Sequence, residues 1–245
     1  MQVLRILIFL FSAASAYAQT SIADRGLYLI DHGLYDEAIF TLGREVEINP
    51  GNVKARILLA SSFAAKNGIV VTRFTAIAKD ILKITKTPPP RGGTAPSPLE
   101  LVMMAFERIP ALPTPQAVAD IQQAIAALDG PGIQRGALLF RATLKVVLFK
   151  FNYYNSNLIR PETGCKIDAK EYEKWMLGLE AQLQSAVTDV QNGMANPKIK
   201  AQIEKFKIDI HDTMSGMATS VDDYSDDPDL MPDEMKATIE LCQSK

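Results

Sequence analysis

The sequence predicts an all-α protein, and three observations lead to this prediction. Apolar residues recur every three or four positions in nearly every long segment, which is the spacing of an amphipathic helix. No stretch shows the sustained alternation of a half-buried strand bounded by hairpin turns. With 245 residues, of which 47% are hydrophobic and 22% charged, the chain is long enough to bury a sizeable core.

The first residues predict export. Residues 1–18 combine one cation, Arg5, with an apolar run from Ile6 to Phe11 and small residues that end at Ala18, which is the pattern of a secretory signal peptide. The apolar run is far below the roughly 20 residues that a membrane-spanning helix needs. We therefore expect cleavage after Ala18, no membrane span in the mature chain, and a periplasmic or secreted location.

Two helical pairs are expected to follow in residues 19–85. Gly33 marks the turn of the first pair, Pro50 its end, and Asn67-Gly68 the end of the next helix. The predicted helices are residues 20–32, 36–48, 52–66 and 71–84. Residues 86–98, KTPPPRGGTAPSP, cannot continue a helix, because the prolines remove backbone donors. We expect a linker or long surface loop there, although such prolines also suit a ligand of a recognition module.

Residues 99–245 predict a helical region packed on these pairs. Thr114 and Pro115 have the character of an N-cap and a first-turn residue. Cations interrupt the apolar segment 137–151, so a buried helix is favoured there and a second membrane span is not. The cations of this helix are expected to extend out along one side. Apolar stripes predict a long antiparallel hairpin from Ala169 to about Asn192 and from Pro197 to about Val221. The other predicted helices are residues 98–109, 115–129, 132–151 and 232–243.

Several residues of the first pair share their spacing with a known repeat. They are Gly26, Gly33, Tyr35, Ala38, Leu42 and Pro50. The pattern resembles the tetratricopeptide repeat, a helix-turn-helix unit of about 34 residues. Leu59, Ala60 and Phe63 match the start of a second unit. Departures from the pattern occur at Ile22, Arg25, Leu29, Thr72, Ala76 and Ile84. The resemblance covers about residues 20–84, as one full repeat and a degenerate one.

The resemblance implies a protein-binding scaffold with a concave face built from the first helix of each unit. The candidate interaction face is Ala23, Leu27, Ile30, Ile57 and Ser61. Repeats that clamp a partner's carboxylate carry lysine and asparagine on this face, whereas the matching slots here hold Ala23 and Leu27, with Ile30 nearby and Ser61 in the next unit, so such a clamp is not expected. These positions suit either an apolar ligand or burial against the later helices. We favour burial, because about three repeats are needed before such a stack is stable alone.

Reaction chemistry is not indicated. His32 and His211 have no other histidine or cysteine within four residues, so local metal-ligand spacing is absent. The glycine-rich residues 130–136 follow no predicted strand and contain a proline, which favours a turn over a phosphate site. Residues 222–229 are acidic but lack the glycine and terminal glutamate of a calcium loop. A net charge of −2 gives no bulk attraction to nucleic acid. We expect no enzyme, cofactor, metal or nucleic-acid partner.

The two cysteines, Cys165 and Cys242, leave two alternatives open. In an oxidising compartment they could form a disulfide, or they could remain separate thiols.

Two functions follow from these observations. The leading hypothesis is an exported, non-enzymatic scaffold or adaptor that mediates protein–protein interaction in the cell envelope with an unidentified partner. The alternative is a periplasmic protein, associated with a transporter, that binds a small apolar ligand between Leu27, Ile30, Ile57 and the segment 137–151.

Overall fold

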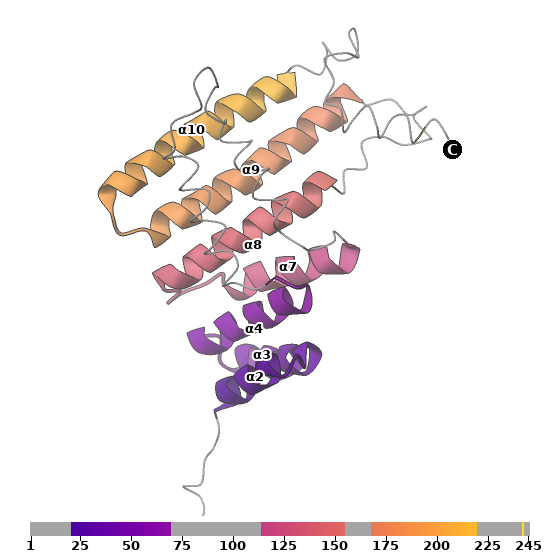
Figure 1. The fold of residues 1–245 in the computed structure, drawn as a ribbon, viewed down its shortest axis with the longest axis vertical. Helices are drawn as coiled ribbons and strands as arrows, with labels where there is room; N and C mark the ends of the chain where they lie inside the picture. Colours follow the sequence, from indigo (N-terminus) through magenta and orange to yellow (C-terminus); the bar gives the residue numbers. More distant parts are fainter. Residues whose placement is uncertain (1–20, 70–113, 155–167, 220–241, 243–245) are drawn as a thin grey trace, which may run out of the picture.

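The computed structural model describes residues 21–69, 114–154, 168–219 and 242, and every regular element within them is a helix (Figure 1). The all-α prediction is confirmed for this part of the chain. Several predicted features lie outside the described residues: the leader 1–18, the helices 71–84 and 98–109, the linker 86–98, the acidic loop 222–229, and the last helix 232–243 except Cys242.

The described helices stack in chain order from one end of the molecule to the other (Figure 1). They are α2 (Ile22–Asp31), α3 (Tyr35–Ile48), α4 (Val53–Lys66), α7 (Pro115–Ala127), α8 (Arg135–Tyr154), α9 (Ala169–Gly193) and α10 (Pro197–Thr219). Each packs against the next, and α2 contacts both α3 and α4. The contact between α4 and α7 makes the helices on either side of residues 70–113 parts of one stack.

Side-chain caps set where several helices begin. Ser21, Asn52, Thr114 and Asp168 each accept a hydrogen bond from the backbone N–H three residues later. Such a bond satisfies one of the amides that a helix start leaves without a partner. Pro115 follows its cap in the first turn, where its missing donor costs nothing. The predicted N-cap at Thr114 is confirmed.

A left-handed glycine reverses the chain between α2 and α3. Gly33 has a φ of +72°, a conformation that favours glycine because it has no Cβ. Around it, the N–H of Gly33 donates to the carbonyl of Ile30 at 3.0 Å and the N–H of Leu34 donates to that of Leu29 at 2.9 Å. This turn returns α3 along the side of α2.

The core runs between the layers of the stack. The predicted stripe on α9 is buried at Tyr172, Met176, Leu179 and Leu183. The facing helix α8 buries Phe140, Leu144, Val147, Phe149 and Phe151. Each such side chain stabilises the fold by roughly 1.5–3 kcal/mol through removal of apolar area from water. Despite this apolar interior, the described part of the chain has no helix with both the length and the apolarity needed to cross a bilayer.

Helices α9 and α10 lie side by side and run in opposite directions. The Gln184 side-chain N–H donates to the carbonyl of Lys207 at 2.9 Å, and the Gln191 side-chain N–H donates to Glu204 at 2.9 Å. These bonds fix the register of one helix along the other.

Candidate functional site

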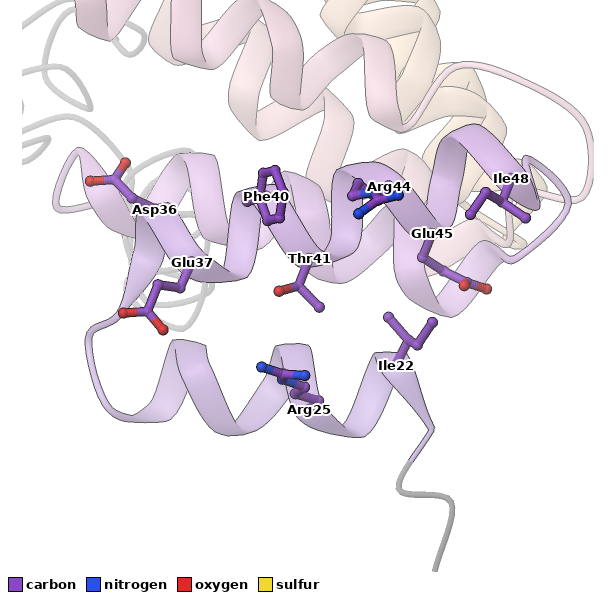
Figure 2. Close-up of a pocket in the computed structure, with 9 residues that line it drawn as sticks. All are labelled: Ile22, Arg25, Asp36, Glu37, Phe40, Thr41, Arg44, Glu45 and Ile48. Atoms are coloured by element: carbon purple, nitrogen blue, oxygen red, sulfur yellow. The ribbon is translucent and has the colours of Figure 1, made fainter.

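An open groove runs along the outer side of α2 and α3, at the end of the stack that begins the fold (Figure 2). It has a volume of about 610 Å³. Its lining combines apolar side chains with charges of both signs: Ile22, Arg25, Asp36, Glu37, Phe40, Thr41, Arg44, Glu45 and Ile48. Figure 2 shows Arg25 and Ile22 extending from α2 toward Thr41 and Glu45 of α3.

The groove lies on the outer side of α3 because the opposite side of α3 is buried against α2 and α4. Ala38 and Leu42 are buried, and Leu42 packs directly on Gly26 of α2. A Cβ on Gly26 would lie only 2.5 Å from Leu42 Cδ2, so the glycine permits the close approach. Phe40 lies about half a turn away from both and faces outward, and Ile48 at the end of α3 is also exposed.

Large apolar side chains in the groove are exposed. Phe40 is 66% exposed, Ile48 is 76% exposed and Ile22 is 45% exposed. Single exposed apolar residues are ordinary on a protein surface, but a group that lines one groove is typical of an interaction site. The guanidinium of Arg44 lies 5.9 Å from the centre of the Phe40 ring, within the range of a cation–π contact.

The charged residues of the groove differ in their partners. The Lys66 ammonium of α4 donates to the Asp36 carboxylate at 2.8 Å, and this hydrogen bond raises the pKa of Lys66. Neither Glu37 nor Arg44 forms an ion pair within the described part of the chain. Their charges are therefore free to pair with a molecule that enters the groove.

The predicted concave face has a different character. Ala23 is buried, Leu27 is exposed, and Ile30, Ile57 and Ser61 are half-buried. Ile30 and Ile57 pack against the core, and the Ser61 hydroxyl donates to the carbonyl of Ile57 at 2.9 Å. Ala23, Leu27 and Ile30 thus lie on α2, and Ile57 and Ser61 lie on α4, whereas the groove runs along the outer side of α2 and α3.

A second polar group joins α8 to α9. Asp189 is 3% exposed, and its carboxylate accepts hydrogen bonds from Arg141 Nε at 2.8 Å and Nη2 at 2.6 Å. Lys145 Nζ lies 2.7 Å from the same carboxylate, while Arg141 also pairs with Asp129. Burial raises the pKa of Asp189, but the hydrogen bonds from Arg141 and Lys145 outweigh it and lower the pKa overall. Arg141 and Lys145, two of the cations that were expected to extend out along one side of the segment 137–151, thus bind Asp189 of α9 instead.

Buried polar side chains also join α4 to α7. Asp120 accepts hydrogen bonds from Asn67 Nδ2 at 3.1 Å and Gln116 Nε2 at 2.8 Å. The buried carboxylate of Asp120 thus has its hydrogen-bond donors within the chain, which is typical of a structural contact.

Arg56 of α4 is a buried cation held by backbone carbonyls. Its Nε donates to the carbonyl of Ala127 at 2.9 Å and its Nη1 to that of Pro131 at 3.1 Å. Gly130, with a φ of +140°, leaves room for the guanidinium, because a Cβ there would lie 2.9 Å from Nη2. The predicted turn thus connects α7 to α8, although α8 already begins at Arg135, and it holds Arg56 at the C-terminal end of α7, where carbonyls attract a cation.

The two histidines lie in separate parts of the stack, His32 at the end of α2 and His211 on α10. His32 Nδ1 donates a hydrogen bond to the Tyr28 carbonyl at 2.8 Å. His211 Nδ1 donates to the Glu180 carboxylate at 2.6 Å, and this hydrogen bond raises the pKa of His211. Within the described ranges, no three His, Cys, Asp or Glu residues come together to hold a metal ion. Cys165 lies outside those ranges, so its pairing with Cys242 stays a prediction.

Sequence reasoning missed the groove and both buried aspartates. A signal for the groove does exist: α3 carries Phe40 and Ile48 on one side and Ala38 and Leu42 on another, so two of its sides are apolar.

The chain was compared with known protein families, curated proteins and solved structures. The chain matches no protein-family model, no curated protein and no solved structure.

Proposed function

We propose that this protein is an exported, non-enzymatic helical scaffold of the cell envelope that binds a protein partner through the groove of α2 and α3. The observation that carries the proposal is the exposure of Ile22, Phe40 and Ile48 in one groove. In a helical stack, the terminal helices need a polar outer face if nothing covers them. This end of the stack instead exposes Ile22, Phe40 and Ile48 among its charged residues, which suits a face that another protein covers.

The shape and charge of the groove favour a helix as the bound element. Two packed helices present a channel between them, and an amphipathic helix can lay its apolar side into such a channel. In this stack α4 already packs against both α2 and α3 from the opposite side. A helix in the groove would repeat that arrangement outside the chain, with Glu37 and Arg44 selecting its charge and direction.

We also propose that α2, α3 and α4 form a tetratricopeptide-like unit. Its support is local: Gly26 packs on Leu42, Gly33 makes the turn, and Leu59, Ala60 and Phe63 are buried on α4. In this proposal the groove is the position that a preceding repeat would occupy. Export rests on the leader at residues 1–18.

Site-specific photo-crosslinking in producing cells tests the proposed function. A benzoylphenylalanine at position 40 should give a protein adduct that mass spectrometry can identify. The matched positions are Leu177 on α9 and Ile208 on α10, which are 49% and 54% exposed and lie outside the groove. A protein adduct at position 40 and none at the other two supports the proposal. An absence of protein adducts at position 40, or equal adducts at all three, would contradict it.

A further inference from the structure

The outer side of α3 has a pattern that is complementary to itself. Glu37, Thr41, Arg44 and Ile48 are spaced by four, three and four residues, so they form one stripe along α3, and Leu34 precedes it by one turn at the N-cap position. With Leu34 included, the stripe has an apolar residue at each end, opposite charges inside them and Thr41 in the middle. Phe40 lies beside the middle of the stripe.

We propose that the partner in the groove is a second copy of this chain, with α3 packed antiparallel on α3 across a two-fold axis near Thr41. This inference rests on the proposed function, since it names the partner at the same groove. In a two-fold contact, residue i of one copy meets j of the other and j meets i. Here Glu37 meets Arg44 twice and Leu34 meets Ile48 twice.

The exposure of these residues agrees with a contact between copies. Leu34 is 43% exposed and Ile48 is 76% exposed, so the apolar ends of the stripe are uncovered in one copy. Glu37 and Arg44 are also exposed and have no ion-pair partner among the residues that the structure describes. The antiparallel pairing gives both charges a partner of opposite sign, whereas a parallel pairing would place like charges together.

Sedimentation equilibrium of the exported full chain, with its N-terminus determined by mass spectrometry, tests the proposal. The weight-average mass should rise with concentration toward twice the mass of one chain. Glu37→Arg and Arg44→Glu should each weaken the association by about tenfold or more, because by symmetry each single change creates two like-charge pairs. The double variant restores both pairs with reversed sign, so its association should return to within about threefold of the original.

Matched controls separate this result from unfolding and from net-charge effects. Lys205→Glu makes the same kind of charge reversal on an exposed position of α10 and should leave the association unchanged. Circular dichroism of all variants should show the same helical content. A single chain mass at every concentration, or a double variant as weak as the singles, would overturn the inference.

The proposed function can survive that failure. If the chain is monomeric but position 40 crosslinks to a different protein, the partner is not a second copy and the scaffold function stands. If the chain is monomeric and position 40 yields no protein adduct, both proposals fail.

Discussion

Replacing Gly26 with alanine tests the close packing that places α3 with one side in the stack and the other in the groove. The new methyl carbon would lie 2.5, 2.6 and 2.8 Å from Cδ2, Cγ and Cδ1 of Leu42. These distances are about 1 Å shorter than ordinary carbon–carbon contacts. Overpacking of this kind costs about 1–3 kcal/mol. Alanine also gains about 1 kcal/mol over glycine from helix propensity.

Gly43→Ala in α3 is the matched control, because a Cβ at Gly43 would meet no atom within 4 Å. It should raise the free energy of unfolding by up to about 1 kcal/mol. The Gly26→Ala variant should fall below the Gly43→Ala variant by about 1–3 kcal/mol, which is the steric cost alone. Urea unfolding followed by circular dichroism measures both free energies, and equal m-values show that the comparison is valid.

A double-mutant cycle with Leu42→Ala makes the test specific. Leu42→Ala should itself cost about 2–5 kcal/mol, but it removes the atoms that clash. Gly26→Ala should therefore no longer destabilise the chain in that background. If Gly26→Ala is as stable as Gly43→Ala, or if its cost is the same with and without Leu42, then α2 and α3 do not pack as described.

Three further predictions concern Asp189, His211 and the two cysteines. Asp189→Asn should lower the free energy of unfolding by about 3 kcal/mol, because two cations of α8 lose their buried partner. Since the pKa of Asp189 is lowered in the fold, its contribution is present above the ordinary aspartate pKa and lost as pH falls through the lowered value, so acid unfolding of the original chain should be steeper than that of the variant. NMR titration should place the pKa of His211 above about 6.5, and Glu180→Gln should lower it. The stability from this raised pKa is present at low pH and lost as pH rises through it. Intact mass spectrometry should find the oxidised chain lighter than the reduced chain by two hydrogen atoms if Cys165 and Cys242 pair, and Cys242→Ser should abolish the difference.

Features that depend on neighbours in sequence could be predicted. The start of α7 follows from Thr114 and Pro115, and the turn before α3 follows from Gly33, because caps and left-handed glycines act within one turn of chain. The buried stripe of α9 was also visible, since Tyr172 and Met176 repeat at helical spacing. Local chemistry therefore determined the helices and most of the side that each one buries.

Features that depend on distant partners could not be predicted. Asp189 and Asp120 have the composition of solvated helix residues, and only the fold brings each of them to donors on another helix. Their burial follows from contacts 48 and 53 residues apart in the chain. The groove is a similar case. Phe40 and Ile48 carry the pattern of core residues, and only the arrangement of helices leaves them at the end of the stack.

The two sides of α3 use charge in opposite ways, and this difference separates the folding contact from the proposed docking contact. Ala38 and Leu42 are buried against the stack, and the charges of α3 that face the rest of the chain have partners there: Asp36 pairs with Lys66, and Glu45 accepts a hydrogen bond from Asn52. The outer stripe carries Glu37 and Arg44 between the apolar residues at its ends. Both charged side chains stay hydrated until a partner with groups of the opposite charge binds. Charges at such a surface contribute to the choice and orientation of the partner more than to affinity. A chain that needed only to complete its own core would gain nothing from them, whereas a chain that assembles after folding needs this selectivity.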